Sequence, residues 1–341
     1  MRKIALACAA VLLCTLFALG GCSTHNQESN VHDQTTPQQP INVRIAALKG
    51  PTAMGMVKFM NEAQSGSIDG NSYVFEIAAS PDMLTPKIAQ GELDIAAVPA
   101  NLASVLYNNL DEGVQVLAVN TLGVLYLCDQ NESVHSVSDL AGKTIYAAGK
   151  GSTPEYALHY ILQENGLTPG TDVSIEWKSE HAECVAALAE NKDAVALLPQ
   201  PFVTVAQSKN ESIRVALDLT KEWDALQKGS EQESALIAGV VVARSAFVEE
   251  HPEVVADFLQ HYQDSVAFVN ENIPEASALV EQFDITPAAV AQKAIPACNI
   301  VCISGDEMKA LLSGYLEVLH EQNPEAVGGN LPSEDFYYNA S

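Results

Sequence analysis

The sequence is poor in basic residues, in cysteine and in long apolar runs, and each shortage excludes a class of protein. Lys and Arg number 17 against 43 Asp and Glu, so the formal net charge is −26. Such an acidic chain argues against a nucleic-acid-binding protein and against a face that binds anionic lipid. The total charge does not fix the charge of a bound ligand, because a local site can oppose the global field.

Cysteine is scarce along most of the chain. Beyond the N-terminal region only four cysteines remain, at positions 128, 184, 298 and 302. They are too scattered for a disulfide framework. Cys298 and Cys302 could pair or bind a metal, but no His or Cys partner lies at a zinc-like spacing. We interpret these cysteines as buried free thiols and expect no metal and no cofactor.

Catalytic signatures are also missing. The sequence contains no Gly-x-Ser-x-Gly elbow and no His-Glu-x-x-His run. His159, His181 and His251 have no obvious carboxylate partner. Residues 149–152 superficially resemble a phosphate loop, but the first glycine of that motif is absent at the required spacing. These absences favour a protein that is not an enzyme.

The N-terminus is typical of an export signal. Arg2 and Lys3 precede an apolar run at residues 4–19 that is too short for a confident transmembrane helix. The run ends in Leu-Gly-Gly-Cys, which resembles the bacterial lipobox. We therefore predict a lipoprotein signal peptide at residues 1–21 and lipid attachment, including palmitate, at Cys22. The alternative is an ordinary secretory signal cut nearby, and either signal exports the protein.

Residues 22–40 predict a flexible tether. They are rich in Gln, Asn, Thr and Pro and almost free of apolar side chains, so they cannot bury enough surface to offset their ordering entropy. About 300 residues remain after the tether, which is enough for one large or two ordinary domains.

Residues 41–60 form the unit around which the domain is organised. Residues 43–48 predict a buried strand, Lys49-Gly50-Pro51-Thr52 interrupts it, and residues 56–60 show helical spacing of apolar side chains. A helix that starts after such a turn exposes free backbone N–H groups at the positive end of its dipole. This turn is a candidate wall of a site for a polar or anionic ligand.

The alternation of strand and helix continues along the chain. Further strands are expected at residues 73–78, 93–98, 114–120, 123–128, 144–148, 173–177, 193–198, 213–217 and 236–243. Helices are expected between them at residues 83–90, 102–108, 156–165, 182–189 and 202–207, and residues 223–229 predict a loop or short helix. This order predicts parallel βαβ units. Asn101 and Thr153 are predicted N-caps, with Pro154 at the first helical position of the second helix.

Everything after residue 247 predicts helix. The expected helices span residues 252–270, 273–281, 287–294 and 307–322, the last capped by Ser304 or Asp306. The tail at residues 328–338 is irregular, and its aromatic side chains are expected to hold it against the body.

Several motifs, taken in order, resemble the solute-binding lipoproteins of ABC importers, in the nitrate/sulfonate/taurine-type group that also includes binders of thiamine-pyrimidine precursors. The resemblance covers residues 43–319. The resemblance rests on these motifs: the lipobox, the turn at residues 48–52, Gly-Glu-Leu-Asp-Ile-Ala at 91–96, Asp-Leu-Ala-Gly-Lys at 139–143, Gly-x-Gly-Ser-Thr at 149–153, and the return strand at 239–243.

The resemblance implies an α/β type II periplasmic-binding-protein fold, in which two hinge strands join two lobes around a ligand cleft. Lobe I would comprise residues 41–127 plus 235–341, and lobe II residues 128–234. The partners would be a small solute and the ABC permease. The protein would be a monomer, anchored through Cys22 to the extracytoplasmic face of the cell membrane.

The resemblance also implies where the solute binds. The expected ligand-binding residues are Lys49, Gly50, Pro51, Thr52, Ala53, Ser80, Asn101, Gly151, Ser152, Thr153 and Gln200. Lys49 or Lys150 could pair with an anionic group, although turn lysines are more often solvated. Four aromatic residues could stack on a flat ring or simply pack in the core: Tyr126, Tyr156, Trp177 and Phe202. The sequence therefore leaves three kinds of solute as alternatives: a sulfonate, nitrate, or a neutral heterocycle such as a pyrimidine.

Two alternatives use the same fold. A lipid-anchored ligand sensor or adhesin could use the clamp without transport, and a neighbouring permease and ATPase would distinguish the two. An enzyme on this fold is the second alternative, and the export signal argues against it.

Overall fold

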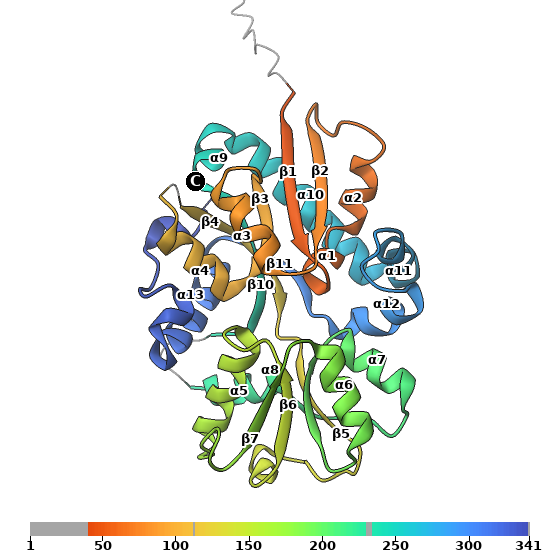
Figure 1. The fold of residues 1–341 in the computed structure, drawn as a ribbon. Coiled ribbons are helices and arrows are strands. Elements are labelled where there is room, and N and C mark those ends of the chain that lie inside the picture. The colour runs from red at the N-terminus through yellow and green to blue at the C-terminus, as the bar shows by residue number, and fades with distance from the viewer. Residues whose placement is uncertain (1–39, 112, 230–233, 340–341) are drawn as a thin grey trace, which may run out of the picture. The chain divides into compact units, whose positions relative to one another are not determined.

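The computed structural model describes residues 40–339, apart from residues 112 and 230–233. The predicted signal peptide, Cys22 and nearly all of the predicted tether lie outside the described residues. The described chain forms two β-sheets with helices on both faces of each (Figure 1).

The first sheet has six strands in the order β11-β4-β10-β3-β1-β2. They are β1 (Asn42–Leu48), β2 (Ser72–Ala78), β3 (Ile95–Pro99), β4 (Val114–Leu122), β10 (Ile237–Arg244) and β11 (Ile300–Ile303). β1 pairs in parallel with β2 and β3, whereas β10 runs antiparallel to both β3 and β4. The antiparallel strand arrives from a distant part of the chain, inserted between two strands of the opening segment.

Helices cover the two faces of this sheet. Core contacts place α1 (Pro51–Met54), α2 (Val57–Ala63), α10 (Pro252–Glu271), α11 (Ile273–Gln282) and α12 (Ala288–Ala294) on one face. On the other face lie α3 (Pro81–Ala89), α4 (Ala100–Asn109) and α13 (Gly305–Gln322). α9 (Ser245–Glu250) follows β10 directly. Both faces of β1 are apolar. Val43 and Ile45 pack in the core beneath α2 and α10, and Ala46 packs in the core beneath α4 and α13.

The second sheet has five strands in the order β7-β6-β8-β5-β9. They are β5 (Leu125–Asp129), β6 (Thr144–Ala148), β7 (Ser174–Lys178), β8 (Val195–Pro199) and β9 (Arg214–Asp218). α5 (Thr153–Glu164) and α8 (Leu219–Gln227) pack on one face, and α6 (His181–Glu190) and α7 (Phe202–Lys209) on the other. Short 3₁₀ helices are Val137–Leu140, Ile295–Ala297, Pro324–Val327 and Glu334–Phe336.

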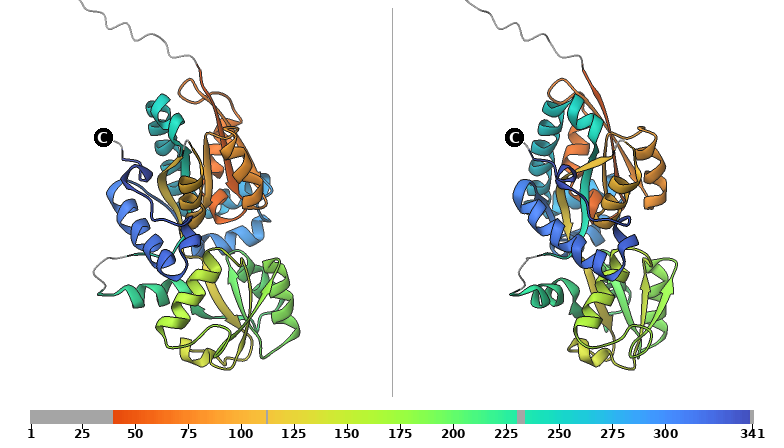
Figure 2. Two further views of the ribbon diagram at one scale, coloured as in Figure 1. Left: turned by 60° about the vertical axis from the view of Figure 1, so that its left-hand side comes forward. Right: turned by 90° about the vertical axis from the view of Figure 1, so that its left-hand side faces the viewer.

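The chain passes from the first sheet to the second between β4 and β5, and returns between α8 and β10 (Figure 2). β5 belongs to the second sheet and starts at Leu125, ahead of the predicted lobe boundary at residue 128. The bounds of the two predicted lobes remain predictions.

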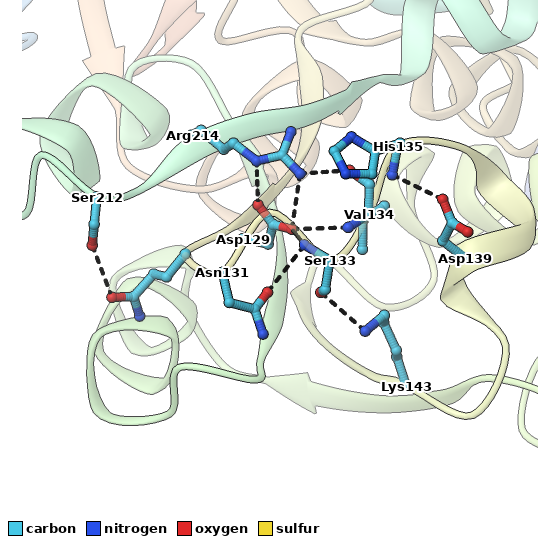
Figure 3. A network of polar contacts seen from close by, with 10 residues as sticks. Asp129, Asn131, Ser133, Val134, His135, Asp139, Lys143, Ser212 and Arg214 are labelled. Atoms are coloured by element: carbon cyan, nitrogen blue, oxygen red, sulfur yellow. Dashed lines mark hydrogen bonds and ion pairs between the residues drawn. The ribbon is translucent and has the colours of Figure 1, made fainter.

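A buried carboxylate anchors the end of β5 that lies away from β4. Asp129 is fully buried, and the guanidinium Nε of Arg214 lies 2.9 Å from its Oδ1. Its Oδ2 accepts hydrogen bonds from the backbone N–H groups of Ser133 and Val134, at 2.9 and 3.1 Å (Figure 3). One carboxylate therefore joins β5, β9 and the loop between β5 and β6.

Two expectations about local structure are wrong, and a third is confirmed with different bounds. β11 lies where only helix was expected, because a four-residue apolar run becomes a strand only through its pairing with β4. Of the loop or short helix expected at residues 223–229, the structure confirms the helix, which begins earlier, at Leu219, and ends at Gln227. Asn101 is not an N-cap: it lies inside α4, and its Nδ2 donates to the Ala326 carbonyl. A tertiary partner has replaced the expected local one.

The four cysteines are free, and three of them are buried. The C-terminal tail is held as expected, because Phe336 is buried against Tyr107 and the Tyr338 N–H donates to the Val116 carbonyl.

Candidate ligand-binding site

The two turns singled out in the sequence line one cavity of about 220 Å³. Lys49, Pro51 and Thr52 approach it from the end of β1, in the first lobe. Ser152 and Thr153 approach it from the start of α5, in the second. We call this cavity the turn cavity. Its walls come from both sheets, as a clamp requires.

A second cavity of about 660 Å³ adjoins it and shares Leu48, Lys49 and His181 with the turn cavity. We call it the outer cavity. Its other walls include Ser80 at the start of α3 and Phe202 at the start of α7. The two cavities together form the candidate cleft.

The first turn has the shape that its sequence predicts. Gly50 adopts φ +131°, a conformation that side-chain-bearing residues rarely reach, and Pro51 occupies the first position of α1. The Thr52 hydroxyl donates to the Leu48 carbonyl at 2.7 Å, and the Lys49 N–H donates to the Ala78 carbonyl at 2.9 Å. These bonds fix the turn against β2, so its groups are presented to the cleft in one orientation.

The second turn differs from its prediction in one respect. Thr153 is the first residue of α5 and Ser152 occupies the N-cap position, without a side-chain capping bond. The Ser152 hydroxyl donates instead to the Gly149 carbonyl at 2.7 Å. Thr153 is buried, and its hydroxyl accepts a hydrogen bond of 3.0 Å from Tyr315. The prediction of Thr153 as an N-cap is therefore wrong.

The structure brings seven of the eleven predicted site residues to the cleft walls: Lys49, Gly50, Pro51, Thr52, Ser80, Ser152 and Thr153. The other four line neither cavity. Ala53 is fully buried in the core beneath the first turn. The Gly151 N–H donates to the Glu155 carboxylate at 2.6 Å, which closes the second turn on itself.

Asn101 and Gln200 are buried, and their side chains make hydrogen bonds within the fold. Asn101 joins α4 to the segment at Ala326, as described above. The Gln200 side-chain oxygen accepts from the Thr204 hydroxyl at 2.9 Å, one turn along α7. Their neighbours Pro99, Pro199 and Pro201 reach the cavity walls instead.

His181 also lines the cleft, although it is not among the predicted site residues. It is the first residue of α6 and lines both cavities, with its ring centroid 5.2 Å from that of Phe202. Its Nδ1 is buried and finds no hydrogen-bond partner among the described residues. Burial lowers the pKa of His181 to about 4, so the imidazole is neutral at pH 7. Its position at a helix start after a strand was the available signal.

Charge in the cleft is nearly balanced. The Lys49 ammonium lies 3.7 Å from the carboxylate of Asp284, which is fully exposed, and Glu180 lines the outer cavity. Lys150 is exposed and belongs to neither wall. Of the four aromatic candidates only Phe202 lines the cleft. No group of three metal-type ligands occurs in the part of the chain that the structure describes.

Helix starts surround the cleft. α3, α5, α6 and α7 each begin with residues that line one of the two cavities. The carboxylates of Glu180 and Glu183 cap the start of α6, whereas no side chain of the described residues caps α3, α5 or α7. The unpaired N–H groups and positive dipole ends of these three helices attract oxygen atoms that carry partial or full negative charge. The site can therefore hold an oxygen-rich solute without an arginine in its walls.

Solved structures share this architecture. An ABC transporter structure from Parabacteroides distasonis superposes with a TM-score of 0.74 at 23% identity, covering 88% of this chain and 99% of that one. The aliphatic sulphonate binding protein SsuA from Escherichia coli gives 0.67 at 16% identity, covering 87% and 96%. The nitrate-binding protein NrtA from Synechocystis gives 0.54 at 13%, covering 73% and 68%. These likenesses confirm the predicted periplasmic-binding-protein fold.

No curated protein sequence matches the chain at a significant level. A family profile does match, over residues 60–294, with the description "ABC transporter, phosphonate, periplasmic substrate-binding protein". The match covers more than half of the chain and confirms the resemblance to substrate-binding proteins of ABC importers. The chain belongs to this family of periplasmic substrate-binding proteins of phosphonate ABC transporters.

Proposed function

We propose that this protein captures a small polar or anionic solute in the cleft between its lobes and delivers it to an ABC permease. The observation that carries the proposal is the turn cavity, whose walls include Thr52 from the first lobe and Ser152 and Thr153 from the second. A solute that bonds to both turns favours the closed arrangement, which is the form a permease can recognise. The proposed lobes are residues 41–127 with 235–341, and residues 128–234.

The proposed solute carries acceptor oxygens and has a small net charge. The family profile points to a phosphonate, and the neighbours SsuA and NrtA are named for sulphonate and nitrate. Hydroxyl groups and helix starts suit all of these oxyanions. The carboxylate of Asp284 near Lys49 partly balances the lysine charge, so the site does not require an anion. The proposal therefore includes a neutral heterocycle that carries an oxygen atom.

Thermal unfolding with a solute panel tests the proposal. The panel contains methylphosphonate, ethanesulfonate, nitrate and cytosine, each titrated against the exported domain. A bound solute at one hundred times its Kd stabilises the native state by about 2.7 kcal/mol, which shifts the midpoint by several degrees. If no member of the panel raises the midpoint, solute capture in this form is wrong.

We also propose that the protein is a monomer, tethered by a lipid on Cys22 to the extracytoplasmic face of the cell membrane. The apolar run and the Leu-Gly-Gly-Cys sequence before the acidic domain support a lipid anchor. No helix of the described residues is both long and apolar enough to cross a membrane. Mass spectrometry of membrane fractions tests the anchor, since Cys22 should be the acylated N-terminal residue. Unmodified, soluble protein would contradict it.

A further inference from the structure

Three hydroxyl groups line the turn cavity, and they differ in where their protons go. The Thr52 hydroxyl donates to the Leu48 carbonyl, and the Ser152 hydroxyl donates to the Gly149 carbonyl, both at 2.7 Å. A hydroxyl has one proton to donate and two lone pairs to accept with. These two oxygens therefore meet a ligand only as acceptors.

The Thr153 hydroxyl has the opposite arrangement. Its oxygen accepts the Tyr315 hydroxyl proton at 3.0 Å, and no acceptor among the described residues takes its own proton. Burial raises the pKa of Tyr315, so this phenol stays protonated and remains a donor in neutral solution. The Thr153 proton is left for whatever occupies the cavity that Thr153 lines.

Tyr315 is held rigidly. It is fully buried on α13, and its ring centroid lies 5.6 Å from that of Trp223 on α8. Trp223 in turn packs 4.7 Å from Tyr160 on α5 and donates its indole N–H to the Ser234 hydroxyl at 3.1 Å. Because α13 also packs against α4 and β4, the phenol is presented to α5 from the first lobe. A fixed donor fixes the direction of the acceptor's remaining proton.

We propose that Tyr315 is a positioning residue that makes the Thr153 hydroxyl a directed hydrogen-bond donor to an oxygen atom of the solute. The inference rests on the proposed solute capture and deepens it by assigning the kind of ligand atom at this wall. A sulfonate, phosphonate, carboxylate or carbonyl oxygen accepts such a proton, whereas an N–H group does not. Tyr315 lies beyond residues 60–294, so the family match assigns it no role.

Calorimetric titration with methylphosphonate and with ethanesulfonate tests the inference. Tyr315→Phe removes only the phenol oxygen, and we expect binding about tenfold weaker, because the Thr153 proton is no longer directed or polarised. Thr153→Val should weaken binding at least as much, and Thr153→Ser should retain it. In the Thr153→Val background, Tyr315→Phe should have no further effect, since the relay is already broken.

A matched control is Tyr160→Phe, which also removes one phenol oxygen from the aromatic cluster around Trp223. The Tyr160 hydroxyl accepts from the Gln227 side chain. The Tyr160→Phe variant should leave the affinity unchanged. Three outcomes overturn the inference alone: affinity of Tyr315→Phe within about twofold of wild type, equal weakening by Tyr160→Phe, or full weakening by Tyr315→Phe in the Thr153→Val background. Failure of wild type to bind either probe or any other panel member overturns the proposed function, and the inference falls with it.

Discussion

Gly239 of β10 lies directly against Thr52: a Cβ built on Gly239 would approach the Thr52 γ-methyl to 2.6 Å and the Asn120 side-chain oxygen to 2.5 Å. The turn that lines the cleft is thus seated on the strand that returns from the second lobe. Any side chain at residue 239 must push the turn away or move the strand.

Gly239→Ala should therefore destabilise the protein and weaken solute binding together. Overpacking of this kind costs about 1–3 kcal/mol in the free energy of unfolding, measured by urea denaturation. Thr52→Ser removes the clashing methyl and keeps the hydroxyl that bonds Leu48. The double variant should recover part of both losses. Equal stability of Gly239→Ala and wild type would show that the turn is loosely seated.

The buried imidazole of His181 gives a pH dependence with a definite sign. Its folded-state pKa of about 4 lies below the ordinary histidine value of roughly 6.5, because burial disfavours the charged form. The unfolded chain thus binds more protons between these values, and stability falls as pH drops from about 6.5 towards 4. The free energy of unfolding of His181→Gln should therefore decrease less than that of wild type over this pH window, by on the order of 1–3 kcal/mol.

Thermal unfolding of both proteins from pH 7 to 4.5 measures the difference, which isolates His181 from the titrating carboxylates. His135→Gln, at an exposed position, is the matched control and should follow wild type. A proton NMR titration of His181 with a midpoint near 6.5 would contradict the prediction, because it would mean that the ring is solvated.

The carboxylate of Asp129 should matter for folding and not for binding. Arg214→Met removes its cationic partner and leaves a buried charge with two backbone N–H bonds. Loss of one member of a buried pair costs about 3–5 kcal/mol in unfolding free energy, and partial exposure of Arg214 favours the lower end. Adding Asp129→Asn should restore part of that loss, because the amide is neutral and keeps one oxygen that can accept from the Ser133 and Val134 N–H groups. Solute affinity should stay unchanged, and a weaker Kd would place this network in the binding mechanism.

The sequence was sufficient for most strands and for the two turns, because those features depend on local patterns. β1, the Gly50 turn and the start of α5 follow from an apolar run, a glycine and a proline. What failed depended on distant partners. Thr153 and Asn101 carry ordinary capping side chains, but Tyr315 and the Ala326 carbonyl bind them instead. No local pattern predicts a partner more than 150 residues away.

His181 illustrates the same limit in the site itself. His181 belongs to no catalytic or metal-binding motif, and only its position at a helix start after a strand pointed to it, yet folding places it on the wall shared by both cavities. Four predicted site residues were neighbours of wall residues rather than wall residues themselves. Register within a turn decides which side chain faces a cleft, and single-sequence reasoning locates turns better than it resolves their registers.

The exposed pair of Lys49 and Asp284 can tell an anionic solute from a neutral one. Asp284→Asn removes the carboxylate 3.7 Å from the Lys49 ammonium and frees that charge for the cleft. Affinity for methylphosphonate should rise by up to about fivefold at low salt, the range expected for an exposed pair, while affinity for cytosine should not change. Lys49→Gln should show the reverse, with methylphosphonate weakened and cytosine retained. Calorimetry at two salt concentrations measures both, and an equal response of the two solutes would mean that Lys49 stays in solvent and that helix starts alone attract the anion.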